Sequence, residues 1–175
     1  MSTPDSTLAT LRPALAAIAA GAVVLLAATA AAAEERANRF NDPFVQITAA
    51  LPRCPVPDPP GVTEQEAALL AHDRAQRGVS CWLAGRCRLP NAYLYDAEIV
   101  PRVQLALRVD GRFGATTSLW ASGSRRWVRV QGCVATAELA AEATRIVRAI
   151  DDVEGVVDEL MVGTDGPPPY RSGSR

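Results

Sequence analysis

The sequence Val128-Arg-Val130-Gln-Gly132-Cys-Val134 alternates apolar residues with other residues. This period of two predicts a strand with one buried face. The chain then crosses an alanine-rich segment and reaches Val153-Glu-Gly-Val156-Val-Asp-Glu-Leu160-Met-Val162, whose composition again predicts a strand. These two segments and the residues between them indicate a mixed α and β fold.

The alanine-rich segment between the two strands predicts an amphipathic helix. Thr136 is a candidate N-cap, and Glu138 places negative charge at the positive end of the helix dipole. Apolar residues then recur at steps of three and four, which gives one apolar stripe. The stripe consists of Leu139, Ala143, Ile146, Val147 and Ile150. It requires a sheet face beside it, which the valines at 128, 130 and 134 supply.

A second helix is expected upstream, from about residue 96 to residue 109, with its regular part starting near Val100 and Pro101 in the first turn. Residues 116–121 then predict a strand, and Ser122-Gly123-Ser124 predicts a hairpin turn into the strand at 127–134. The order is helix, strand, strand, helix, strand. We therefore expect an α+β domain with a three-stranded sheet and two helices on one face.

This order of elements resembles the BON domain family, a small bacterial α+β module of cell-envelope proteins. The resemblance rests on spaced small and aliphatic residues over residues 96–163 and on no catalytic residue. The family usually has Gly just before the Val that opens the last strand, whereas Asp152 precedes Val153 here and Gly155 follows. The resemblance implies binding to membranes, anionic lipid or envelope partners, and it implies no chemistry. No small-molecule substrate is evident from the sequence.

The N-terminus predicts export. Residues 13–33 contain no charge and are rich in Ala, Val and Leu, and Ala31-Ala32-Ala33 gives the small-x-small pattern that signal peptidase cleaves. The length also permits an uncleaved anchor in the inner membrane. The alanine-rich composition and the cleavage pattern favour a signal peptide, residues 1–33, and a periplasmic protein that starts at Glu34.

Two further regions complete the expected organisation. Residues 34–95 are Cys- and Pro-rich, with one helix that opens at the capping box Thr63-Glu-Gln-Glu66 and stops at Gly78. Trp82, Tyr93 and Tyr95 in this segment could form a recognition surface, but a small core is the favoured interpretation. Residues 164–175 have the composition of a linker, which predicts a disordered tail.

The net charge of the chain does not indicate which class of partner it binds. All 18 basic residues are Arg, and the net charge is −1, so no overall field favours nucleic acid. Local clusters remain: Arg86 and Arg88 flank Cys87, and three arginines lie near the expected hairpin. Solvated surface charge is the simplest interpretation of both clusters.

The four cysteines are Cys54, Cys81, Cys87 and Cys133. In an exported chain an even count favours two disulfides over a metal site with His72, because the tight Cys-x-x-Cys spacing of zinc modules is absent. Alternation along its strand places Cys133 on the sheet face away from the helices. A bond from Cys133 to an upstream cysteine would fasten the N-terminal segment over that face, whereas a Cys81–Cys87 loop with two free thiols is the alternative.

No feature of the sequence predicts an enzyme. There is no nucleophile–base pair at a readable spacing, and no glycine-rich phosphate loop in a strand–helix context. The carboxylate pairs Glu64–Glu66 and Asp151–Asp152 lie at helix ends, where capping and dipole effects explain them. We expect no catalytic residue, cofactor or metal.

The sequence predicts a non-enzymatic envelope module that contacts membrane lipid or an envelope protein. A structural or scaffolding subunit is the alternative, and a metal- or redox-active protein is less favoured. Guanidinium groups near the hairpin could bind lipid phosphate, and indoles suit a membrane interface. The candidate binding residues are Arg125, Arg126, Arg129, Trp120 and Trp127.

Overall fold

The structure is a computed structural model in which residues 34–173 are described. The expected signal peptide, residues 1–33, lies outside the described residues, as do residues 174 and 175. No helix within residues 34–173 combines the length and the apolar character that crossing a membrane requires.

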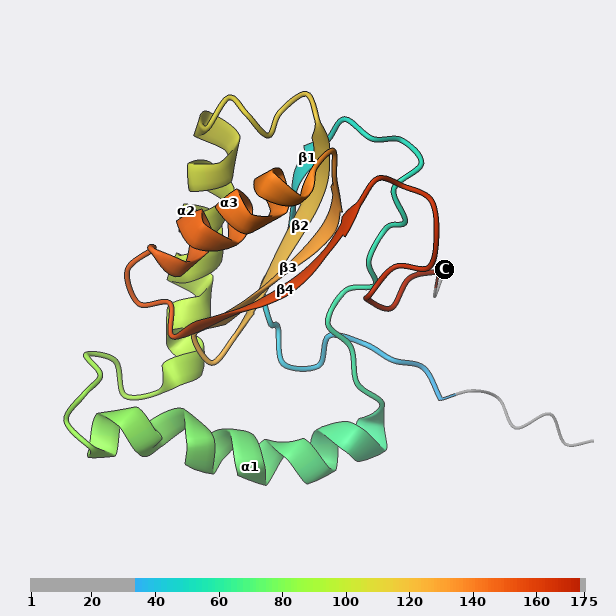
Figure 1. The fold of residues 1–175 in the computed structure, drawn as a ribbon. Helices are drawn as coiled ribbons and strands as arrows, with labels where there is room; N and C mark the ends of the chain where they lie inside the picture. Colours follow the sequence, from blue (N-terminus) through green and yellow to red (C-terminus); the bar gives the residue numbers. More distant parts are fainter. Residues whose placement is uncertain (1–33, 174–175) are drawn as a thin grey trace, which may run out of the picture. The chain divides into compact units, whose positions relative to one another are not determined.

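A four-stranded sheet forms the centre of the fold, with the strands in the order β1-β2-β3-β4 (Figure 1). The first two pairs of neighbours are antiparallel, and β3 and β4 are parallel. The parallel pair requires a crossover connection, which α3 (Ala137–Arg148) supplies. The strands are β1 (Phe44–Ala49), β2 (Thr117–Ser124), β3 (Trp127–Val134) and β4 (Gly155–Val162).

The main core lies between one face of the sheet and two helices. A short 3₁₀ helix, η1 (Ala92–Tyr95), leads into α2 (Asp96–Val109), which packs on β1 and β2, while α3 packs on β3 and β4. Both helices lie on the same side of the sheet in Figure 1. Each large aliphatic side chain buried here contributes roughly 1.5–3 kcal/mol. The fully buried members include Ile99, Val103, Leu107, Leu119, Val128, Val130, Val134 and Val147.

The prediction of a mixed α+β fold is confirmed, but the expected strand count of three is wrong. The fourth strand, β1, comes from the Pro-rich segment before the expected domain and pairs antiparallel with β2, from Phe44 opposite Ser122 to Ala49 opposite Ser118. Val45 and Ile47 on this strand add to the main core. The upstream segment is therefore part of the same fold, and residues 34–173 contain three α-helices beside the sheet.

The opposite face of the sheet is covered by irregular chain and a disulfide. Cys54 and Cys133 are bonded, with their Cα atoms 5.8 Å apart, and Trp120 is buried beside them. This confirms that Cys133 points away from the helices and fastens the upstream segment over the sheet. Cys81 and Cys87 form a second bond, so no cysteine is free.

The C-terminal segment also packs on this face, in contrast to the disordered tail that its composition predicts. Tyr170 is buried, and its hydroxyl donates to the carbonyl of Pro55 at 2.7 Å. The carbonyl of Arg171 accepts from the amide of Asp58 at 2.9 Å. Burial raises the pKa of Tyr170 to about 12, so the phenol keeps the proton that it donates.

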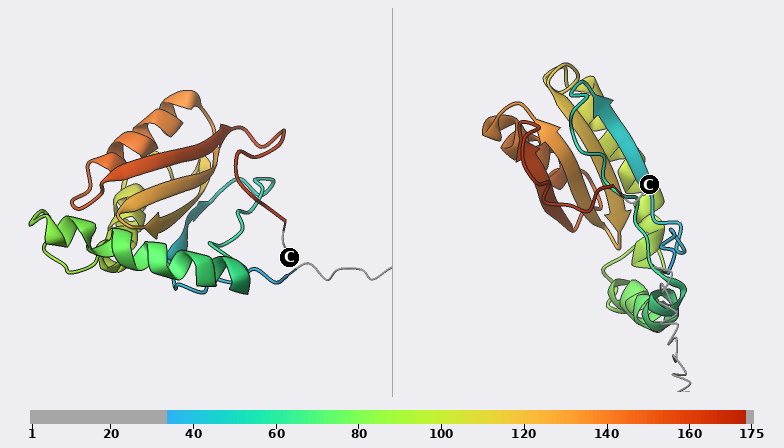
Figure 2. Two further views of the ribbon diagram at one scale, coloured as in Figure 1. Left: turned by 90° about the horizontal axis from the view of Figure 1, so that it is seen from below. Right: turned by 90° about the vertical axis from the view of Figure 1, so that its right-hand side faces the viewer.

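The longest helix within residues 34–173, α1 (Glu64–Leu83), lies beyond one end of the sheet, as Figure 1 and the right-hand view of Figure 2 show. The predicted capping box is present: Thr63 Oγ1 accepts from the Glu66 amide, and Glu66 accepts from the Thr63 amide. The helix passes the expected stop at Gly78 and continues to Leu83. Gly78 is its one buried residue, because the side chain of Asn91 fills the space where a Cβ would lie.

Candidate functional site

The turn between β2 and β3 lies at the end of the sheet that faces α1. Its two central residues are Arg125 and Arg126, with φ values of 57° and 68°. Two consecutive left-handed residues define the type I′ hairpin turn, for which Asn-Gly is the favoured sequence. The expected turn at Ser122-Gly123-Ser124 is therefore wrong: these residues belong to β2, and the true turn lies just beyond them, at a pair of bulky arginines.

A buried carboxylate holds this turn in place. The Asp96 carboxylate accepts the Arg125 amide and the Arg126 amide, each at 2.7 Å. Asp96 is almost fully buried, and burial raises its pKa to about 6 although the two amide hydrogen bonds lower it. Gly123 allows the start of α2 to approach this closely, because a Cβ there would lie 2.9 Å from Val100 Cγ2.

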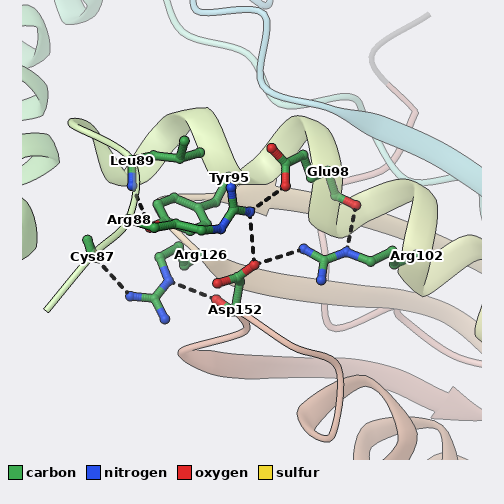
Figure 3. Close-up of polar contacts among 8 residues, drawn as sticks. All are labelled: Cys87, Arg88, Leu89, Tyr95, Glu98, Arg102, Arg126 and Asp152. Atoms are coloured by element: carbon green, nitrogen blue, oxygen red, sulfur yellow. Dashed lines mark hydrogen bonds and ion pairs between the residues drawn. The ribbon is translucent and has the colours of Figure 1, made fainter.

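The side chain of Arg126 points back into the protein. Its Nε donates to the Asp152 carbonyl at 2.8 Å, and its Nη1 lies 3.2 Å from Cys87 Sγ. The guanidinium carbon also lies 5.1 Å from the centroid of the Tyr95 ring, while that of Arg88 lies 4.8 Å from the same ring (Figure 3). Arg126 therefore ties the turn to two other segments, and only part of it can face a ligand.

Asp152 joins the loop after α3 to the rest of this end. Its carboxylate pairs with Arg88 and with Arg102, each at 3.2 Å (Figure 3). Burial alone would raise the pKa of Asp152, but the hydrogen bonds from Arg88 and Arg102 outweigh it and the pKa is lowered. Its φ of 70° lies in the left-handed region.

A cavity of about 320 Å³ opens between α1, η1 and the β2–β3 turn. We call it the arginine cavity. Four guanidinium side chains and one carboxylate line it, so positive charge predominates at its wall. Its lining residues are Arg77, Ser80, Cys81, Arg86, Ala92, Arg125, Arg126 and Glu154.

The four arginines differ in how far the protein neutralises them. Arg77 pairs with Asp73 at 2.8 Å, and Arg126 lies 3.9 Å from Glu154. Among residues 34–173, the guanidinium groups of Arg86 and Arg125 have no hydrogen bond or ion pair. Two charges at the cavity are thus available to an anion.

The Cys81–Cys87 disulfide shapes one wall of the cavity. It closes a loop of six residues that leaves the end of α1, and Arg86 lies in this loop. The Arg86 amide also donates to the Cys81 carbonyl at 2.9 Å. The bond therefore restricts where Arg86 can lie relative to Arg77 on the helix.

The structure separates the five binding residues suggested by the sequence. Arg125 and Arg126 lie together at the cavity, whereas Arg129 pairs with Glu159 on the sheet face that carries the Cys54–Cys133 bond. Trp120 is 5% exposed and packs against that disulfide, so it is not part of an exposed surface. Trp127 is 41% exposed beside the turn, and its ring covers Gly155.

Sequence reasoning did not place Arg77 at this end, and it favoured a core position for Trp82. Trp82 and Leu83 follow the cavity residue Cys81 on α1 and are 47% and 78% exposed. Tyr95 is buried as expected, and Tyr93 is half-buried under the Arg74 guanidinium.

The described residues offer no ligand set for a metal. Within residues 34–173, no three His, Cys, Asp or Glu side chains are grouped so that they could hold an ion. All four cysteines are used in disulfides, and His72 is exposed on α1. The chemistry available at the arginine cavity is anion binding.

Comparison with known proteins finds a family for the C-terminal part of the chain. Residues 95–164 match the family model of the BON domain. No curated protein and no solved structure matched the chain.

The one departure from the family pattern has a structural explanation, because Asp152, where the family usually has Gly, adopts the left-handed conformation that favours glycine. BON domains are non-catalytic binding modules generally associated with membrane or envelope interactions. The part of this chain from residue 95 to residue 164 is a BON domain.

Proposed function

We propose that the protein is a non-enzymatic binding module of the cell envelope that contacts an anionic membrane surface through the end carrying the arginine cavity. The single observation that carries this proposal is the cavity itself, with two guanidinium groups that no side chain of residues 34–173 neutralises. The BON domain supports the envelope context.

Exposed apolar side chains at the same end support a membrane rather than a purely aqueous partner. Trp82 and Leu83 extend α1 beyond the cavity, and Trp127 lies next to the turn. An indole is stable where one side is apolar and the other is wet, which is the condition at a membrane interface. Arginine can meanwhile bind a lipid phosphate through two parallel N–H bonds.

The attraction must be local, because the whole chain has a net charge of −1. Each arginine close to an anionic surface contributes about 1 kcal/mol, and salt screens this contribution within roughly 10 Å at 0.1 M. Binding by two or three arginines with two indoles is expected to be moderate at low salt and weak at high salt.

Vesicle flotation tests the proposal. The wild type should float with vesicles of phosphatidylglycerol and phosphatidylcholine at low salt, and an Arg86→Gln/Arg125→Gln variant should lose most of this binding. The matched control is Arg108→Gln/Arg148→Gln, which removes two exposed arginines that also lack an ion pair within residues 34–173 and lie at the helix C-terminal ends. Equal loss in both variants, or no loss in either, would contradict the proposed contact surface.

A protein partner in the envelope is the competing interpretation, and scaffolding is a form of it. It predicts that the wild type binds native envelope membranes but not protein-free vesicles, and that protease treatment of those membranes abolishes binding. Recovery of binding on vesicles of extracted lipid would exclude it.

Export is proposed separately, on the sequence of residues 13–33. The mature protein would begin at Glu34 and reside in the periplasm, with a single N-terminal anchor as the alternative. Sequencing the N-terminus of the protein from an envelope fraction decides between cleavage and anchoring. An intact N-terminus in the cytosol would contradict both.

A further inference from the structure

The arginine cavity has the features of a discrete site as well as those of a charged surface. Its volume of about 320 Å³ lies at the lower end of the range for small-molecule sites. A surface patch would attract many anions loosely, whereas a lined cavity can hold one. We infer that the cavity binds a single phosphate group, donated by a lipid headgroup or by a soluble phosphate ester.

The placement of the donors on separate segments favours a tetrahedral anion. The guanidinium groups come from three separate segments: Arg77 from α1, Arg86 from the disulfide loop, and Arg125 and Arg126 from the β2–β3 turn. A planar carboxylate presents two oxygens on one side, so one arginine can satisfy it. A phosphate presents oxygens in several directions and can accept from several guanidinium groups at once.

The lining also limits what else the ligand can contain. Apart from Ala92 and Cys81, the lining residues are polar or charged. An apolar group would find little surface to contact there, so the organic part of an ester must extend into solvent or into a membrane. This cavity thus selects the phosphate and is indifferent to most of what the phosphate carries.

The backbone of the turn provides an independent argument. Arg125 and Arg126 both occupy left-handed conformations that bulky residues rarely adopt, and the turn would be less strained with Asn-Gly. Asp96 holds both amides, so the strained turn is rigidly supported. Backbone strain maintained in this way is typical of positions where the side chain has a role. At Arg126 that role is contact with Tyr95, Cys87 and Asp152, while the Arg125 side chain lines the cavity and its guanidinium makes no hydrogen bond or ion pair within residues 34–173.

This inference rests on the same cavity as the proposed function, so the experiment must separate the two. Backbone amide NMR of the full chain is followed during titration with inorganic phosphate and with glycerol phosphate, against sodium chloride at equal ionic strength. Saturable shifts confined to Arg86, Ala92, Arg125 and Arg126, with one site per chain, are expected from both phosphate probes and not from chloride.

Variants then assign the site. Arg86→Gln and Arg125→Gln should each weaken phosphate binding on the order of tenfold, because each removes one charge-assisted pair of hydrogen bonds. Arg108→Gln should leave the affinity unchanged. Absence of saturable shifts in the wild type, or equal weakening by Arg108→Gln, would overturn the inference.

Competition identifies the source of the phosphate. If glycerol phosphate releases the protein from phosphatidylglycerol vesicles, the cavity holds the lipid headgroup. If phosphate binds at the cavity while the protein ignores vesicles, the site takes a soluble ester, the inference stands and the proposed membrane contact fails. If the protein binds vesicles with no phosphate site, the proposed function stands and this inference fails.

Discussion

The sheet face sealed by Cys54–Cys133 and the cavity end beside Cys81–Cys87 use the same covalent bond for different purposes. The first bond is buried with Trp120 and joins residues 79 positions apart, so it connects the upstream segment to the domain. The second joins residues six positions apart at the rim of an open cavity. The first bond therefore stabilises the fold, and we propose that the second mainly positions Arg86 at the cavity.

The largest effect is expected at the sealed face. In the chain-entropy model, closing a loop of 79 residues stabilises the protein by about 4.5 kcal/mol, and closing one of six residues by about 2 kcal/mol. Cys54→Ala/Cys133→Ala should therefore lower the free energy of unfolding by about 4 kcal/mol and expose Trp120. Urea denaturation followed by tryptophan fluorescence measures both. Equal losses for the two disulfides would remove the distinction between the regions.

The next effect concerns Asp96 and pH at the cavity end. Its pKa is about 6 in the folded protein against an ordinary value of 3.8, so the folded state holds a proton that the unfolded state releases. This contribution to stability is complete below about pH 4 and is lost as pH rises through 6. Between pH 4 and pH 7 the free energy of unfolding of the wild type should consequently fall by up to about 3 kcal/mol relative to that of Asp96→Asn.

Denaturation of both proteins at several pH values checks this difference, and comparison with the variant cancels the carboxylates that they share. Asp42 and Arg74 are the charges that act on Asp96, with Asp42 raising its pKa and Arg74 lowering it. If the wild type instead becomes more stable relative to Asp96→Asn as pH rises, the hydrogen bonds from the turn amides lower the pKa of Asp96 by more than burial raises it. The carboxylate is then ionised throughout this range.

A smaller loss of stability, about 2 kcal/mol, is expected for Cys81→Ser/Cys87→Ser. Its more informative result is phosphate affinity, which should fall several-fold because Arg86 is no longer held at the cavity rim. Cys54→Ala/Cys133→Ala is the matched control, measured where it remains folded, and it should bind phosphate as the wild type does. A full-affinity Cys81→Ser/Cys87→Ser variant would show that the loop needs no covalent restraint.

The sequence was sufficient for the features that depend on local periodicity. Along β3, Val130 and Val134 share one face and Cys133 lies on the other, so the alternation predicted that the cysteine faces away from the helices. The apolar stripe of α3 predicted that this helix packs on the sheet. β1 could not be found in this way, because its six residues are flanked by Pro43 and Pro52 and gain their structure by pairing with β2, over 60 residues later.

The candidate site was only partly predictable, for two physical reasons. Gly123 indicated a turn, but its actual role is to let α2 approach β2, and the turn falls on two arginines whose conformation depends on the Asp96 carboxylate. Arg77 reaches the cavity through the tertiary placement of α1, which no local pattern encodes. The arginine cluster at 125 and 126 was visible in the sequence, whereas the cavity that it lines was not.

The smallest expected effect is at Asp152, where this chain departs from the family pattern. Asp152→Gly and Asp152→Ala both remove the carboxylate that pairs with Arg88 and Arg102, and they differ only in a Cβ at a φ of 70°. Ion pairs between partly exposed side chains add little net stability, and the Asp152 carbonyl that accepts from Arg126 remains in both variants.

Asp152→Gly should be about as stable as the wild type, and Asp152→Ala about 1 kcal/mol less stable than Asp152→Gly because of the left-handed backbone. Urea denaturation of the three proteins measures these differences. If the two variants are equally and strongly destabilised, the ion pairs of Asp152 rather than its backbone conformation determine the stability of this turn. The cavity end would then owe its stability mainly to charge, whereas the sealed face owes its stability to a disulfide and burial.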